Sequence, residues 1–293
     1  MESSLVVGTD GSESSIRATD WAADEALLRG LRLRVVYASL WHRYEGALAT
    51  GLARPDGQVL AENIVGAAAE RAAIRTPDLN VTTEVLSEDA IPALLREGQR
   101  AFALVTGSRG RGGVAGLLLG SVSLAVAAGA HCPVIVVRGD KAGLDGVHGR
   151  IVLGVGDADI DSAAVRFAFS EAHLRSCGLD VVHAWRCPSH ETADHPLLAG
   201  SPARYHEERA SALLDDALRV AVDAYPDVTV RRVTAEGPAY KALLTRSAVG
   251  DLLVVGARRR QSRIGMQLGR VGHAALHHAA CPVAVVPDMG EGA

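Results

Sequence analysis

The chain repeats itself, and this repeat limits the folds that it can adopt. The segment 5–8 (LVVG) matches 151–154 (IVLG) at an offset of 146 residues, and 132–134 (CPV) matches 281–283 (CPV) at an offset of 149. A period of this length exceeds that of any solenoid repeat, so the sequence predicts two whole domains of the same design. A chain of 293 residues is long enough for each domain to bury its own core.

In each copy, apolar segments typical of buried strands alternate with segments typical of helices. In the first copy we expect strands at 5–9, 33–38, 81–86, 102–106 and 134–137, and helices from about 13 to 30 and at 59–75, 91–98 and 121–130. For the first helix we expect Ser12 as N-cap, Gly30 as C-cap, and Trp21, Ala22, Ala26 and Leu27 on the apolar side. The alternation predicts an α/β fold of two tandem doubly wound, Rossmann-like parallel sheets with helices on both faces.

The repeat also predicts the domain boundaries. We expect a first domain at 1–138, a linker at 139–149, a second domain at 150–288 and a tail at 289–293. The change of offset places three extra residues in the second copy, between its second strand and its third helix.

A glycine-rich segment lies between a predicted strand and a predicted helix of the first copy. It runs from Gly107 to Ser123 and reads GSRGRGGVAGLLLGSVS. Glycines let backbone N–H groups approach a ligand closely, and a helix N-terminus attracts anions, so this segment is a candidate phosphate site. Arg109 and Arg111 add positive charge, and Ser121 adds a hydroxyl donor. By itself, the segment is equally typical of a flexible turn between two core elements.

The spacing within this segment is more specific. No lysine occurs between Gly107 and Asp140, so the P-loop pattern is absent. Two residues separate Gly107 from Gly110, and nine separate Gly110 from the pair Gly120-Ser121. This spacing resembles the ATP-binding signature of the universal stress protein family, as do the words VTGSRGRGG, LLLGSVS and HCPVIVV. The resemblance implies a fold like that of the adenine nucleotide alpha hydrolases, and ATP, with or without magnesium, as the ligand.

The resemblance also implies which residues hold the nucleotide. In the family, the aspartate matching Asp10 and the main chain matching Ala38 hold the nucleoside, while the segments matching 107–110 and 120–123 hold the phosphates. The carboxyl ends of parallel strands meet at one edge of a sheet, so these segments converge on one crevice. The predicted binding residues are Gly8, Asp10, Ala38, Gly107, Arg109, Gly110, Arg111, Gly120, Ser121, Val122 and Ser123. From the residues alone, Asp10 is equally well explained as a helix cap.

The second copy departs from this pattern at three positions. Gly156 stands in place of Asp10, Arg259 in place of Gly110, and Arg270 in place of Ser121. A Cβ at 259 obstructs close approach of the backbone, and Arg270 removes a hydroxyl at the helix start. We therefore expect the second copy to bind ATP poorly or not at all.

The residues near the predicted phosphate site favour binding of ATP over its hydrolysis. Apart from Asp10, the matched motif offers no acidic residue to bind magnesium or to orient a nucleophile. We therefore expect a nucleotide-dependent regulator or sensor with at most slow ATP hydrolysis and no catalytic residues, and the resemblance implies a role in stress responses. Two alternatives remain: an ATP-hydrolysing or adenylating enzyme of the same fold group, and an interaction scaffold that binds no nucleotide. The family's last strand commonly pairs across a domain interface, so the resemblance implies an internal pseudo-twofold pair of 134–137 with 283–286, and we also expect a homodimer.

Composition excludes several classes of partner. The net charge of −4 argues against a general nucleic-acid binder and against a protein that binds membrane surfaces. The uncharged stretch from Gly112 to Val137 is long enough to span a bilayer, but Pro133 and several glycines interrupt it. We see no export signal at the start and expect buried thiols instead of disulfides, which together indicate a cytoplasmic protein. His273 and His277 have the spacing of two metal ligands, but we expect a surface or packing role and no metal site.

Overall fold

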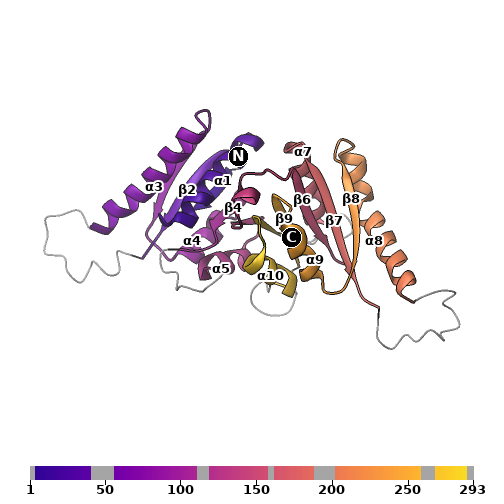
Figure 1. Cartoon of the computed structure of the whole chain (residues 1–293). Helices are drawn as coiled ribbons and strands as arrows, with labels where there is room; N and C mark the ends of the chain where they lie inside the picture. The colour runs from indigo at the N-terminus through magenta and orange to yellow at the C-terminus, as the bar shows by residue number, and fades with distance from the viewer. Residues whose placement is uncertain are drawn as a thin grey trace. The chain divides into compact units, whose positions relative to one another are not determined.

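The computed structural model describes residues 4–40, 56–110, 119–157, 162–187, 202–258 and 268–288. These residues form two compact units, one up to Arg138 and the other from Gly139 onward. Figure 1 colours the first unit in indigo and magenta and the end of the second in orange and yellow. Each unit is an α/β domain with its own parallel strands and helices, which confirms the predicted fold class.

In the first unit, the described strands are all parallel and follow the order β3-β2-β1-β4-β5. Their bounds are β1 Ser4–Gly8, β2 Arg32–Ala38, β3 Val81–Leu86, β4 Ala101–Gly107 and β5 Val134–Val137. The strand order reverses between β1 and β4, which are neighbours in the sheet although β2 and β3 separate them along the chain. A doubly wound sheet binds its ligands at such a switch point.

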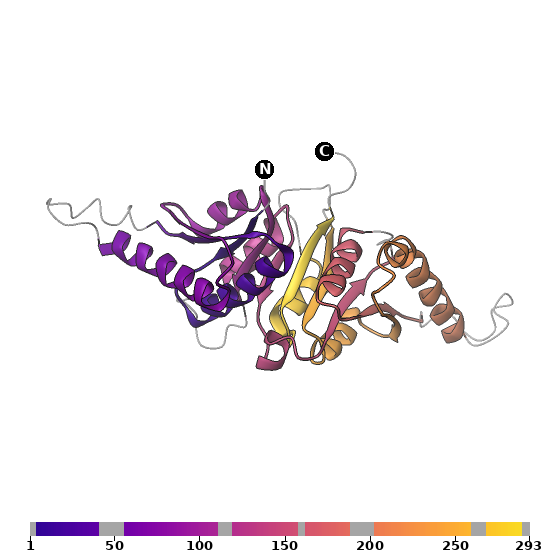
Figure 2. The ribbon, with the colours of Figure 1, turned by 90° about the horizontal axis from the view of Figure 1, so that it is seen from above.

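Helices cover both faces of this sheet. Their bounds are α1 Glu13–Arg29, α3 Asp56–Arg75, α4 Ala90–Glu97 and α5 Ser121–Gly129. Helix α1 packs with α3, and α4 packs with α5 (Figures 1 and 2). Strands β1, β4 and β5 are almost continuously apolar, with Leu5, Leu104 and Ile135 buried. Burial on both faces explains why these strands lack the alternation of polar and apolar residues, whereas β3 (VTTEVL) carries exposed polar residues.

Local sequence signals set the limits of α1. The Ser12 side chain accepts a hydrogen bond from the Ser15 N–H, and Gly30 ends the helix with a φ of 63°. Both caps were predicted, and three of the four predicted apolar residues are buried. The prediction for Leu27 is wrong, because its side chain is 48% exposed. Each helical residue is rotated by about 100° from the one before, so Ala26 faces the core and Leu27 turns away from it.

Successive residues of β4 face opposite helix layers. A Cβ built on Gly107 would lie 2.6 Å from Ser14 Oγ of α1, so position 107 faces α1. Leu104 lies on the other side of the sheet, where its Cδ1 would be 2.7 Å from a Cβ on Gly98 at the end of α4. Thr106 is two residues after Leu104 and therefore also faces the layer of α4 and α5.

The second unit repeats this design, with the described strands in the order β10-β9-β6-β7-β8. The strand bounds are β6 Arg150–Val155, β7 Gly178–Trp185, β8 Val230–Glu236, β9 Leu252–Arg258 and β10 Val283–Asp288. The helix bounds are α6 Lys141–Leu144, α7 Ala163–Leu174, α8 Pro202–Ala224, α9 Ala239–Ser247 and α10 Arg270–His278. Helix α7 has 12 residues, whereas α1 has 17, and a longer connection precedes α7.

The cysteines singled out in the sequence are buried, and the two histidines contact one another on α10, where His273 is exposed. Cys132 and Cys281 are buried free thiols, as predicted, and burial raises the pKa of the Cys132 thiol to about 11. The rings of His273 and His277 stack with their centroids 4.4 Å apart. None of the helices in the described segments is both long and apolar enough to cross a membrane.

Candidate functional site

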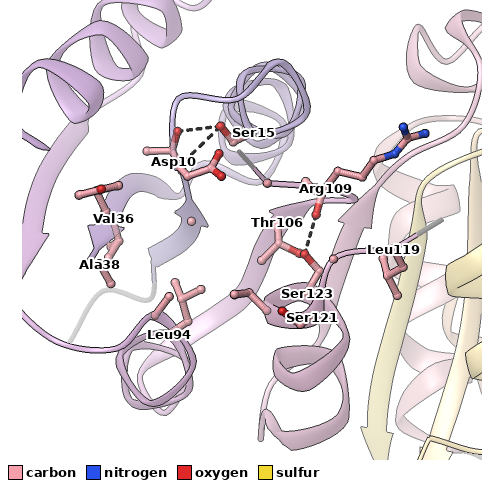
Figure 3. Close-up of a pocket in the computed structure, with 18 residues that line it drawn as sticks. Asp10, Ser15, Val36, Ala38, Leu94, Thr106, Arg109, Leu119, Ser121 and Ser123 are labelled. Carbon is pink, nitrogen blue, oxygen red and sulfur yellow. Dashed lines mark hydrogen bonds between the residues drawn. The ribbon is translucent and has the colours of Figure 1, made fainter. Parts of the chain in front are cut away.

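A pocket of about 470 Å³ opens at the switch point of the first sheet (Figure 3). The carboxyl ends of β1, β2 and β4 form its floor, α4 and the N-terminus of α5 form its sides, and the turn before α1 lies above it. A volume in this range is typical of pockets that hold a small molecule.

Most of the predicted binding residues line this pocket. They are Gly8, Asp10, Ala38, Gly107, Arg109, Gly110, Gly120, Ser121, Val122 and Ser123. Arg111 lies outside the described residues. Lining residues that were not predicted are Thr9, Ser15, Val36, Tyr37, Ala90, Leu94, Thr106 and Leu119. No sequence signal indicates the two from α4, because Ala90 and Leu94 have the spacing of ordinary core residues on an amphipathic helix.

One end of the pocket is formed by backbone groups. Helix α5 begins directly after Gly120, whose N–H donates to the Ser108 carbonyl over 2.8 Å. The Ser123 hydroxyl donates to the Gly107 carbonyl over 2.7 Å and ties the start of α5 to the end of β4. The first N–H groups of a helix have no partner within it, and they carry partial positive charge. This end therefore has the chemistry of an anion site.

At Gly107 a glycine is required for lack of space, whereas a Cβ on Gly120 would meet its nearest atoms at 3.6 Å. The φ angles of Gly107, Gly110 and Gly120 are not positive. A Cβ on Gly107 would lie 2.6 to 2.7 Å from three atoms of Ser14, two of them in the backbone. A Cβ on Gly110 would lie 2.7 Å from Asp10 Oδ2. At Gly107, therefore, it is α1 that excludes a side chain.

The turn before α1 fixes the glycine-rich loop from above. Asp10 Oδ1 accepts the Ser12 N–H over 3.0 Å in the turn before the helix; the helix cap is Ser12, so the capping role considered for Asp10 is not observed. Ser14 Oγ accepts the Arg109 N–H over 3.2 Å, and the Ser12 hydroxyl donates to the Arg109 carbonyl over 3.4 Å. Arg109 thus contributes its backbone to this network, and Figure 3 shows its side chain extending away from Asp10 and Thr106.

The other end of the pocket is apolar. Val36 and Ala38 come from β2, and Ala90 and Leu94 come from α4. A flat ring system fits between a strand and a helix of this composition, because it needs apolar contact on both faces. The pocket therefore has an apolar end and an anion-binding end, and the floor of β1 and β4 lies between them.

The equivalent pocket of the second unit is smaller, at about 170 Å³. Its apolar end is preserved, since Val182, Ala184, Ala239 and Leu243 replace the four residues just described. The polar residues have been lost: Val155, Gly156 and Val255 stand where the first unit has Thr9, Asp10 and Thr106. Arg259 lies outside the described residues, and Arg270 begins α10.

Comparison with known proteins identifies the family. The family model described as "Universal stress protein family" matches residues 1–138 and 148–287. The chain belongs to the universal stress protein family. The resemblance inferred from the glycine spacing is thereby confirmed, and the family model matches the chain twice in tandem.

Two of the similar proteins match over nearly the whole chain, and a third matches over about half of it. The universal stress protein Rv2005c of Mycobacterium tuberculosis is 34% identical over 288 residues, which cover 96% of each chain. A crystal structure of a universal stress protein from Archaeoglobus fulgidus covers 97% of this chain and 98% of its own, with a TM-score of 0.66 and 18% identity. A second universal stress protein of Archaeoglobus fulgidus, solved in complex with dAMP, covers 46% of this chain and 98% of its own at 22% identity, with a TM-score of 0.36.

Proposed function

We propose that the first unit of this universal stress protein binds ATP or a closely related adenine nucleotide. The observation that carries the proposal is one pocket with an apolar slot at one end and the free N–H groups of α5 at the other. A nucleotide has this same division, with a flat apolar base and an anionic phosphate chain.

The base is placed between β2 and α4, against Val36, Ala38 and Leu94. The phosphates are placed at the loop 107–110 and at the first turn of α5, where main-chain N–H groups are the donors. Asp10 stands at the turn above the pocket, where a carboxylate suits a sugar hydroxyl. Since the Arg109 side chain extends away from the pocket, the grip on the phosphates comes mainly from the backbone.

We propose that the second unit does not bind a nucleotide. Its pocket is about a third of the size and lacks a polar side chain among its described lining residues. A pocket of this size, without a hydrogen-bonding side chain among its described lining residues, offers a nucleotide fewer contacts to replace those that it loses to water. We therefore expect one bound nucleotide per chain.

ATP acts here as a regulatory ligand, and turnover is slow or absent. Among the described lining residues, Asp10 is the one carboxylate, and it is engaged with the Ser12 N–H. Magnesium would then reach the pocket on the nucleotide's own phosphates. Binding of a ligand to the folded state alone stabilises the conformation or assembly that holds it, such as the homodimer expected from the sequence.

Titration calorimetry with ATP tests the proposal directly. We expect saturable binding with a stoichiometry of one per chain, and ATP turnover below about 1 per second, the low end of typical enzyme rates. Two equivalents per chain would reject the inactive second unit. Absence of heat at millimolar ATP, or rapid turnover, would reject the function itself.

A further inference from the structure

The Thr106 hydroxyl is a buried polar group with no partner in the protein. Thr106 is 4% exposed, and no hydrogen-bond donor or acceptor among residues of the described segments reaches its Oγ1. A buried hydroxyl without a hydrogen bond costs free energy, so such groups are rare unless a ligand or water completes them. Thr106 is among the residues that line the larger pocket, whereas its Oγ1 atom is itself covered by protein atoms.

Thr106 lies midway along the proposed path of the nucleotide. It is the last residue but one of β4 and pairs with Gly8 of β1 at the switch point. Its side chain faces the layer of α4 and α5, because Leu104 faces α4 two residues earlier. In Figure 3, Thr106 lies between Leu94 on the apolar side and Ser121 on the anion-binding side.

The neighbouring hydroxyls are already engaged. Thr9 Oγ1 donates to Ser15 Oγ over 3.1 Å, and the Ser123 hydroxyl donates to the Gly107 carbonyl. The second unit has valine at the position equivalent to Thr106, which is Val255, and its pocket is small and apolar. Threonine and valine have nearly the same size, so packing alone does not require the hydroxyl at 106.

We propose that a rotation about χ1 turns the Thr106 hydroxyl into the pocket, where it donates a hydrogen bond to an oxygen of the phosphate nearest the sugar and so selects nucleotides over nucleosides. This inference rests on the proposed function, because it needs the base beside Leu94 and the phosphates beside Ser121. A ligand that joins those two ends must cross the end of β4, and the part that crosses is the junction of sugar and first phosphate. Thr106 is then a specificity-determining residue of the site.

Thr106→Val tests this inference by copying the residue of the second unit. Calorimetric affinities are measured for ATP, AMP and adenosine. We expect ATP and AMP to bind about tenfold more weakly to the variant, since a hydrogen bond to a charged group is lost, and adenosine to bind within twofold of wild type. Thr106→Ser keeps the hydroxyl and should stay within about threefold for all three ligands. Val255→Thr makes the reverse change in the second unit and should leave all three affinities unchanged.

The unfolding midpoint of the ligand-free variant separates ligand recognition from a structural role. Thr106→Val removes an unpaired buried hydroxyl, so its midpoint should equal or exceed that of wild type although its nucleotide affinity falls. A lower midpoint, equal AMP affinity in variant and wild type, or an equal loss for adenosine would each overturn the inference. If wild type binds no nucleotide, the proposed function fails as well. If wild type binds and Thr106→Val binds equally, the inference about Thr106 alone fails.

Discussion

Substitution of Gly107 by alanine should destabilise the first unit, whereas the equivalent substitution in the second unit should have little effect. The new Cβ would lie 2.6 Å from Ser14 Oγ and 2.7 Å from the Ser14 carbonyl carbon and oxygen. Two of these atoms are backbone atoms inside α1, so relief requires movement of the helix or of the end of β4. The matched control is Gly256→Ala at the equivalent position of the second unit, where the nearest atom is the Ala164 Cβ at 3.6 Å.

The expected cost of Gly107→Ala follows from this crowding. Overpacking of a close-packed core costs about 1–3 kcal/mol, and we expect about 2 kcal/mol because backbone atoms must give way. Unfolding entropy is about 2.1 cal/mol/K per residue, so for a unit of roughly 140 residues the midpoint should fall by about 7 °C. The same movement displaces the Arg109 N–H from Ser14 and shifts the phosphate loop. Loss of one N–H contact to a charged phosphate should weaken ATP binding at least about tenfold.

Both consequences can be measured on the full chain. Thermal unfolding followed by circular dichroism gives the midpoints, and hydrogen exchange of the β1 and β4 amides shows which unit is destabilised. Titration calorimetry gives the ATP affinity. Gly256→Ala should leave the midpoints and the ATP affinity unchanged or slightly raise stability. The reasoning is refuted if Gly107→Ala is neutral, or if the two variants lose stability equally.

Three further changes have defined outcomes. Gly110→Arg, which copies the second unit, should abolish retention of nucleotide in the purified protein as measured by mass spectrometry, and unchanged occupancy would show that the phosphate loop is misassigned. Iodoacetamide at pH 8 should leave Cys132 unmodified in the folded protein, because burial raises its pKa to about 11 and disfavours the thiolate, whereas rapid labelling would contradict this burial. Asp180→Asn should lower the stability of the second unit by about 2 kcal/mol, since Asp180 is buried between Arg150 at 2.5 Å and Arg246 at 2.9 Å, both of them partly exposed. A urea midpoint equal to that of wild type would show that these ion pairs contribute nothing.

The sequence was sufficient to predict the elements that depend on local signals. Ser12 and Gly30 predicted the ends of α1, and an uninterrupted apolar segment predicted β5 at its observed bounds. The bounds of β3 were also predicted, although its sequence VTTEVL is partly polar. The order of strands in each sheet has no local signal, but the alternation of elements and the family resemblance implied a doubly wound sheet.

The site residues that could be predicted are those whose residue type and spacing indicate a binding role. Glycines and serines at unusual spacing indicated the loop 107–110 and the start of α5. Leu94 and Thr106 gave no signal, because a leucine on an amphipathic helix and a threonine in a buried strand have ordinary structural explanations. Thr106 stands out only once the structure shows that its buried hydroxyl lacks a partner among the described residues. The role of Gly107 in accommodating α1 likewise required the position of Ser14.

The central claim is that main-chain N–H groups of the first unit grip the phosphates of a nucleotide. Backbone amide shifts in ¹⁵N–¹H spectra, recorded with ATP and with adenosine, test it most directly. We predict that ATP shifts the amides of Gly110, Ser121, Val122 and Ser123, that adenosine shifts those of Ala38 and Leu94 but not those four, and that the amides of the second unit stay in place. Binding of ATP without movement of the amides of residues 121–123, or with equal shifts at the start of α10, would contradict the claim.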